Sequence, residues 1–93
     1  MVLLMLADDA PTGRAEAIAA AIAALPSEIP SIRSVEVGVD MGIGQGTSSV
    51  GLTMTFDDEA GWRAYQNHPA HQVVIADLIR PVLASRAAVQ IAI

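Results

Sequence analysis

Residues 32–57 read IRSVEVGVDMGIGQGTSSVGLTMTFD and contain the pattern that decides the fold. Apolar residues occupy alternate positions in both halves: Val35, Val37, Val39 and Met41, then Val50, Leu52, Met54 and Phe56. Because successive side chains of a strand point to opposite faces, this alternation predicts two β-strands, each with one apolar face. The connection between them, Gly42–Ser49, is rich in glycine, and we expect it to be a flexible hairpin loop.

The residues before this hairpin predict one further strand and one helix. Val2–Ala7 is a continuous apolar run, which is typical of a strand that is buried on both faces. Beyond it, an alanine-rich segment carries apolar residues at the spacing of a helix face: Ile18, Ile22 and Leu25. We expect Thr12 to cap this helix and Pro26 to end it.

The residues after the hairpin predict a broken helical region and a last strand. Asp57 is placed to cap a short helix that runs to about Asn67. A second apolar stripe covers Ala70–Leu83, where Pro81 should bend or end the helix. Alternating apolar residues then predict a strand over Ala87–Ile93.

The predicted order of elements is β-α-β-β-α-β, the ferredoxin-like arrangement of an α+β fold with a four-stranded antiparallel sheet. We interpret residues 1–93 as a single domain of this kind. Two helices cover only one face of four strands, although the first strand is apolar on both faces. The uncovered face needs protection, and we therefore expect a homodimer in which two sheets pack face to face.

The composition supports the same expectation. Of the 93 residues, 53% are hydrophobic but only 3% are aromatic, so small aliphatic side chains must build the core. Such side chains bury less area each than aromatic ones do. A short domain can compensate for this by burying surface against a second copy of itself.

Charge and cysteine content exclude several classes of function. The formal net charge is −5 and the five basic residues, all of them Arg, are scattered, which disfavours a nucleic-acid partner and an anionic membrane surface. The absence of cysteine excludes disulfides and thiolate chemistry. The apolar start of the sequence lacks the basic residues of a secretory signal, and we expect a cytoplasmic protein.

One short segment gathers the side chains that are best suited to chemistry. Residues 65–71 read YQNHPAH and hold both histidines and the single tyrosine. A functional interpretation makes Tyr65, His68 and His71 ligand-binding residues, with Tyr65 and His71 also catalytic. A structural interpretation stays open, in which His68 caps the next helix, His71 only donates a hydrogen bond and Tyr65 packs in the core. We expect no metal site, because Pro69 disturbs the histidine spacing and no third ligand is adjacent.

The same segment resembles a motif of the stress-responsive A/B barrel family, Tyr-x-x-His-Pro-x-His followed by an apolar helix, a proline and a final strand. Residues 25–32, LPSEIPSI, are similar to the helix-to-strand junction of that family, and the resemblance covers essentially the whole chain. It implies a dimeric α/β barrel. The family includes plant stress proteins, many uncharacterised bacterial proteins and a plant polyketide cyclase that closes an aromatic ring by aldol condensation.

This resemblance implies roles for two residues. In the cyclase the tyrosine and the second histidine of the motif serve the reaction, and these positions correspond to Tyr65 and His71. A neutral imidazole can remove a proton next to a carbonyl group while a phenol donates a hydrogen bond to the developing enolate. Such chemistry needs no cofactor. Many family members carry a further histidine in the first strand, at about the position of Met1.

Three functions stay open at this point. The first, which we expect, is the binding of a small apolar or carbonyl-containing molecule in a pocket near Tyr65 and His71. The second is a cofactor-free enzyme of the polyketide cyclase type or of the related monooxygenase type. The third is a non-catalytic structural dimer connected with stress tolerance.

Overall fold

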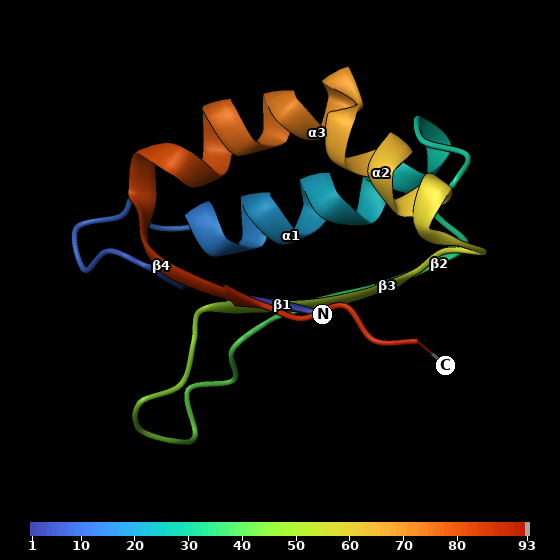
Figure 1. Ribbon diagram of the computed structural model, residues 1–93. Coiled ribbons are helices and arrows are strands. Elements are labelled where there is room, and N and C mark those ends of the chain that lie inside the picture. The colour runs from blue at the N-terminus through green and yellow to red at the C-terminus, as the bar shows by residue number, and fades with distance from the viewer. Residues whose placement is uncertain (93) are drawn as a thin grey trace.

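Four strands form one antiparallel sheet, and helices lie across only one of its faces (Figure 1). This computed structural model describes residues 1–92. The strands are β1 (Val2–Leu6), β2 (Ser34–Val39), β3 (Val50–Thr55) and β4 (Leu83–Ala88); the helices are α1 (Arg14–Ala24), α2 (Glu59–Asn67) and α3 (Pro69–Val74). A 3-10 turn at Leu25–Ser27 follows α1, and a π turn at Ile75–Ile79 and a 3-10 turn at Arg80–Val82 follow α3. The order in the sheet is β2-β3-β1-β4. None of the helices in residues 1–92 is long and apolar enough to cross a membrane.

The core lies between the sheet and the helices. Leu4 in β1 is 3% exposed, pairs with Val50 of β3 and belongs to one buried cluster with Ile18 and Ile22 of α1. A second cluster joins the end of α1 to α2 and contains Leu25, Ile29, Ile32 and Tyr65. Most apolar positions of the two strands belong to these clusters or pack against them, so the alternation in the sequence marks the face that the helices cover: Val35, Val37, Val50, Leu52 and Met54.

The opposite side of the sheet, which carries Leu3 and Gly51 and is called the open face below, has no helix over it. Leu3 is 44% exposed and points to the open face because its neighbour Leu4 points into the core. Figure 1 shows the β2–β3 connection and the segment after β4 on this same side. These two segments carry four further exposed apolar residues: Met41, Ile43, Val89 and Ile91.

The last strand begins earlier than the sequence predicts. β4 covers Leu83–Ala88 rather than Ala87–Ile93, and it pairs with β1 along its length. The preceding helical turn ends at Val82, directly after Pro81, so the prediction that this proline ends the helix is confirmed. The alternating apolar residues after residue 88 do not mark the strand. Residues 83–88 are mostly small and have a weak intrinsic preference for strands, but pairing with β1 holds them in one. Ile93 lies outside the described residues.

Both predicted caps lie one residue away from the observed ones. Gly13, not Thr12, precedes α1, and its φ of 85° is left-handed backbone that glycine adopts without strain; no side chain caps this helix. Asp58, not Asp57, caps α2 by accepting a 2.8 Å backbone hydrogen bond in the first turn. Asp57 instead forms a 2.8 Å ion pair with Arg33, across the ends of β3 and β2.

The connection between β2 and β3, which we expect to be a flexible loop from its sequence, carries side-chain hydrogen bonds at both ends. Asp40 accepts hydrogen bonds from the Gly42 amide and the Thr47 hydroxyl, each 3.0 Å long. At the other end the Ser49 hydroxyl accepts a 3.0 Å hydrogen bond from the amide of Leu6. Polar side chains thus anchor the ends of a segment whose glycine content alone predicts a flexible loop.

Candidate functional site

A break between α2 and α3 brings Tyr65 and His71 together. Pro69 is the first residue of α3, and the residue before a proline avoids helical backbone, so His68 is extended with φ −70° and ψ 135°. The chain therefore changes direction at His68 (Figure 1). A continuous helix would place residues six positions apart on different faces, whereas this break allows the two rings to meet.

The rings of Tyr65 and His71 stack on each other. Their centroids lie 4.1 Å apart and their planes are inclined by 29°. The ring of Phe56, which follows β3, also contacts Tyr65, with a centroid separation of 5.4 Å. Tyr65 and His71 are each 8% exposed. The structure thus places these two candidate residues in one buried aromatic unit.

Both rings carry a polar atom that the protein does not use. His71 Nδ1 lies 3.4 Å from the carbonyl oxygen of Gln66. Because a carbonyl oxygen only accepts hydrogen bonds, this contact favours the tautomer in which Nδ1 carries the proton and Nε2 keeps its lone pair. Within residues 1–92, neither Nε2 nor the Tyr65 hydroxyl has a hydrogen-bond partner, and neither is sealed from solvent; the one sealed and unpartnered side-chain atom in this range is Ser31 Oγ.

Burial determines the protonation state of both rings. Burial lowers the pKa of His71, an effect that hydrogen bonds to the Gln66 and Tyr65 carbonyl groups oppose and the charge of Arg86 reinforces. Burial raises the pKa of the Tyr65 phenol, and Arg86 acts in the opposite direction there. At neutral pH the imidazole is therefore uncharged and the phenol keeps its proton. A proton acceptor and a hydrogen-bond donor thus lie side by side, an arrangement that suits a carbonyl compound.

The lowered pKa of His71 has a consequence for stability. Above about pH 6.5, the ordinary histidine value, the ring is neutral in both the folded and the unfolded chain. Below this pH the unfolded chain binds a proton that the buried ring resists, so the free energy of unfolding falls until the pH reaches the lowered pKa of the folded state. We expect urea unfolding to show this loss as the pH falls below about 6.5.

A pair of matched variants isolates the cause of this loss. His71→Gln should remove part of the pH dependence, because it removes the ring that titrates between the two states. His68→Gln should keep it, since the His71 ring and its neighbours Tyr65 and Arg86 remain in place. Equal pH dependence in the wild type and in His71→Gln would contradict the assignment.

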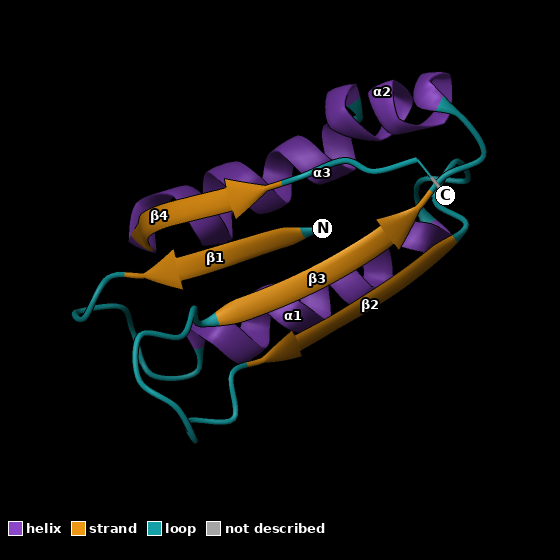
Figure 2. Cartoon of the chain, turned by 60° about the horizontal axis from the view of Figure 1, so that its bottom comes forward, coloured by secondary structure: helices purple, strands orange, loops and turns teal. Residues whose placement is uncertain are grey.

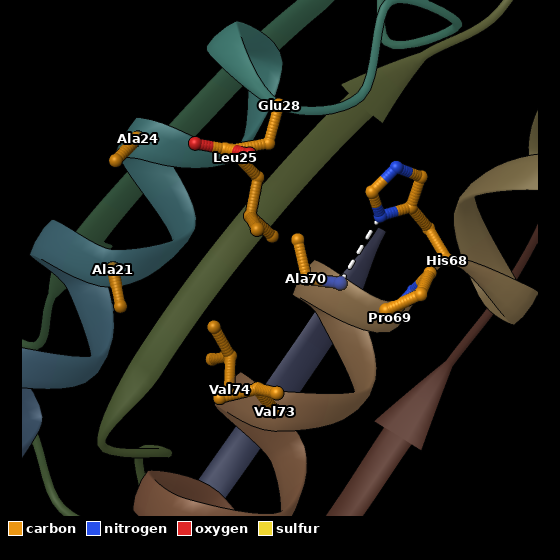
Figure 3. Close-up of a pocket in the computed structure, with 9 residues that line it drawn as sticks. All are labelled: Ala21, Ala24, Leu25, Glu28, His68, Pro69, Ala70, Val73 and Val74. Atoms are coloured by element: carbon orange, nitrogen blue, oxygen red, sulfur yellow. Dashed lines mark hydrogen bonds between the residues drawn. The ribbon is translucent and has the colours of Figure 1, made fainter.

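His68 occupies a different place from the other two candidates. Its Nδ1 accepts a 3.0 Å hydrogen bond from the Ala70 amide and so caps α3. Figure 3 shows the ring beside a groove between the end of α1 and the start of α3. The groove has a volume of about 490 Å³ and is lined mostly by alanine, leucine and valine side chains. Neither Tyr65 nor His71 lines it, so the three candidate residues do not form one pocket.

A second hollow lies on the open face. It has a volume of about 530 Å³ and is bordered by Leu3, by Val50 and by the ends of the β2–β3 connection. Tyr65 and His71 do not line this hollow either. The pocket that we expect around His71 from the sequence therefore coincides with neither hollow.

The described chain offers no cluster of metal ligands. In residues 1–92, no three histidine, aspartate or glutamate side chains come close enough together to hold a metal ion. His68 and His71 differ in their surroundings. His68 caps α3 beside the groove between α1 and α3, called the outer groove below, whereas His71 stacks on Tyr65.

Arg86 is a candidate that sequence reasoning missed. Nothing in the sequence pattern distinguishes Arg86 from the other scattered arginines, and the predicted last strand begins one residue after it, at Ala87. In the structure Arg86 lies in β4 and pairs with Leu4 of β1. Residues directly opposite each other in a sheet project to the same face, so Arg86 points to the side that the helices cover. Only the register of β1 against β4 reveals this.

Comparison with known families decides the family of this fold. The family model Dabb, described as Stress responsive A/B Barrel Domain, matches residues 1–93. The chain belongs to this family. The resemblance that the segment from Tyr65 to His71 carries is thus confirmed. None of the curated proteins matches this A/B barrel chain.

Solved structures agree with the A/B barrel assignment. A dimeric ferredoxin-like protein of unknown function from Thermobifida fusca is 35% identical, with a TM-score of 0.87 over 99% of this chain and 86% of that one. A dimeric protein of unknown function with a ferredoxin-like fold from Bacteroides fragilis is 32% identical, with a TM-score of 0.78 over 95% and 87%. A Dabb family protein with a ferredoxin-like fold from Mesorhizobium loti is 17% identical, with a TM-score of 0.72 over 98% and 93%, and supports the fold alone. The predicted ferredoxin-like α+β fold is confirmed.

Proposed function

We propose that this A/B barrel protein is a homodimer that binds a small carbonyl-containing or apolar molecule at the Tyr65–His71 pair. The observation that carries the proposal is that two stacked and largely buried rings each keep a polar atom without a hydrogen-bond partner in residues 1–92, His71 Nε2 and the Tyr65 hydroxyl. A buried tyrosine hydroxyl normally finds a partner within the protein. A ligand oxygen would supply that partner here, and the ring faces would contact the apolar part of the ligand.

Binding at this pair requires a local movement. Each residue is 8% exposed and the rings lie against each other, so a ligand must shift the His71 ring relative to Tyr65. The break at His68 places His71 in the first turn of a separate short helix, and a movement of its ring changes the contacts that tie α3 to the Gln66 carbonyl and the Tyr65 ring of α2. The magnetic environment of both rings should therefore change when the site is filled.

The homodimer is supported by the open face. Leu3 is exposed at its centre, and the β2–β3 connection and the segment after β4 add exposed apolar side chains on the same side. Large exposed apolar patches are usual at an interface and rare on a monomer, and a second copy would cover these side chains. The Thermobifida fusca and Bacteroides fragilis proteins, which are 35% and 32% identical, are both described as dimeric.

A cofactor-free enzyme is the second candidate. The uncharged imidazole beside a protonated phenol favours it, because the former can accept a proton from a carbon next to a carbonyl and the latter can donate to the resulting enolate. We assign either function to the cytoplasm, since a domain without cysteine needs no oxidising compartment.

Titration with benzamide, a neutral carbonyl compound, tests the proposed site. The chain holds one tyrosine and two histidines, so the ring signals in an NMR spectrum are few and easily assigned. We expect the Tyr65 and His71 signals to shift together and to saturate. Movement of the His68 signals alone would place binding in the outer groove of Figure 3. No movement at millimolar benzamide would favour the non-catalytic dimer instead.

A further inference from the structure

Arg86 stands beside the proposed site without a partner of its own. Its register with Leu4 directs the side chain to the helix-covered face of the sheet. Figure 2 shows β4 as an edge strand on the side of α3, the helix that carries His71. Within residues 1–92, no hydrogen bond or ion pair engages the guanidinium group. The edge of the sheet therefore leaves this cation free to meet an incoming molecule.

Three of the other arginines use their guanidinium group in a hydrogen bond or an ion pair within the protein. Each is held by another part of the protein: Arg14 donates to the Leu78 carbonyl at 3.1 Å, Arg33 pairs with Asp57 at 2.8 Å, and Arg63 pairs with Glu59 at 2.6 Å. The sequence holds ten acidic residues against five basic ones, so carboxylate partners are plentiful. A guanidinium that meets none of them, on the covered face of the sheet, is placed for a partner from outside the chain.

The charge of Arg86 reaches both rings of the site. It lowers the pKa of His71 and also that of Tyr65. Arg86 is the one charged side chain of the described residues that acts on either pKa, so the charge that reaches the pair from β4 is positive. A positive field at the position of a ligand favours an anion.

We propose that Arg86 makes the Tyr65–His71 site selective for small molecules that carry a carboxylate. The inference rests on the proposed function and names its ligand class, an aromatic acid or a keto acid. A guanidinium binds a carboxylate through two parallel N–H···O bonds, which fixes the orientation of the ligand as well as its charge. With the carboxylate held at β4, the rest of the ligand extends toward the two rings.

A charged residue on an edge strand has another use, because it discourages pairing with foreign strands. That use requires a charge at the edge but gives no preference among ligands. The comparison of benzoate with benzamide separates the two roles, because these molecules differ in charge and hardly in shape. Arg80 provides the matched control: it is exposed, lies before β4 and acts on neither ring, so Arg80→Met changes the net charge equally.

We expect the wild type to bind benzoate at least about tenfold more tightly than benzamide, as a charged hydrogen-bonded pair would. Arg86→Met should abolish this preference, while Arg80→Met should keep it. Arg86 is exposed, so its replacement should leave the fold intact, which circular dichroism checks. The pKa of His71 in an NMR titration should also rise in Arg86→Met, because a nearby positive charge is lost.

Two results would overturn the inference in distinguishable ways. If both probes shift the Tyr65 and His71 signals equally, or if Arg86→Met keeps the benzoate preference, the site stands and the carboxylate selectivity is wrong. If neither probe shifts these signals in the wild type, the proposed function fails and the inference fails with it.

Discussion

We expect Leu4→Asp to unfold the protein and Leu3→Asp to leave it folded but monomeric. The two leucines are neighbours on β1 and point to opposite faces of the sheet. Leu4 is 3% exposed and packs with Ile18 and Ile22. Loss of a buried leucine costs about 2–5 kcal/mol, and the new carboxylate is buried without a partner. Together these costs approach the whole stability of a small domain, about 5–15 kcal/mol.

Leu3 gives the opposite outcome because its surroundings differ. It is 44% exposed in the single chain, so an aspartate there stays hydrated and the fold survives, as thermal unfolding followed by circular dichroism would show. In the proposed homodimer the same carboxylate faces the partner sheet, and light scattering should report the monomer mass. A Leu3→Asp protein that remains dimeric would contradict the face-to-face arrangement. A folded Leu4→Asp protein would contradict the assignment of the core.

Tyr65→Phe and His71→Ala should weaken ligand binding to a similar extent but differ in stability. The Tyr65 hydroxyl has no partner within residues 1–92, so its removal should hardly change the free energy of unfolding while benzamide binds about tenfold more weakly. His71→Ala removes a ring that is 8% exposed and stacked on Tyr65. We expect a loss of about 1–3 kcal/mol of stability there, from the lost stacking and the lost contact with the Gln66 carbonyl, which keeps the Gln72 side chain as a donor.

Because Tyr65→Phe should weaken binding without a loss of stability, it tests the proposed site more sharply than His71→Ala does. From the sequence, a functional His71 should be replaceable at little cost in stability; its burial and stacking make that expectation wrong even for a functional residue. Urea unfolding measures stability, and the NMR titration measures affinity. If Tyr65→Phe loses stability and binds benzamide unchanged, the tyrosine is part of the scaffold and the proposed site is refuted.

The period of the apolar residues determined most of the fold. Alternation in residues 32–57 identifies two strands and the face they bury, because a strand repeats every two residues. Helical spacing from Ile18 to Leu25 identifies α1, and Pro69 and Pro81 mark where helical segments start and stop. These signals are local: each depends on the backbone geometry of a few consecutive residues, and the chain order β-α-β-β-α-β follows from them.

Element boundaries depended on contacts that the sequence does not display. Asp57 and Asp58 are both suited to cap α2, and the choice between them follows from Arg33, which lies next to Asp57 only after β2 and β3 have paired. β4 is a similar case, since its small residues show weak strand preference and its position is set by pairing with β1. Which of two neighbouring residues begins or ends an element is therefore set by contacts with the partner strand, and not by the intrinsic secondary-structure propensity of the residues.

The candidate site, like the fold, could be predicted only in part from the sequence. The sequence by itself determined that Tyr65 and His71 belong together, because Pro69 breaks the helix between them and the spacing then permits contact. It did not determine that His68 faces a separate groove, or that Arg86 lies on the covered face of the sheet. Those positions depend on how α3 packs against α1 and on the register of β1 against β4. Both are contacts between residues far apart in the chain, and only the tertiary structure decides them.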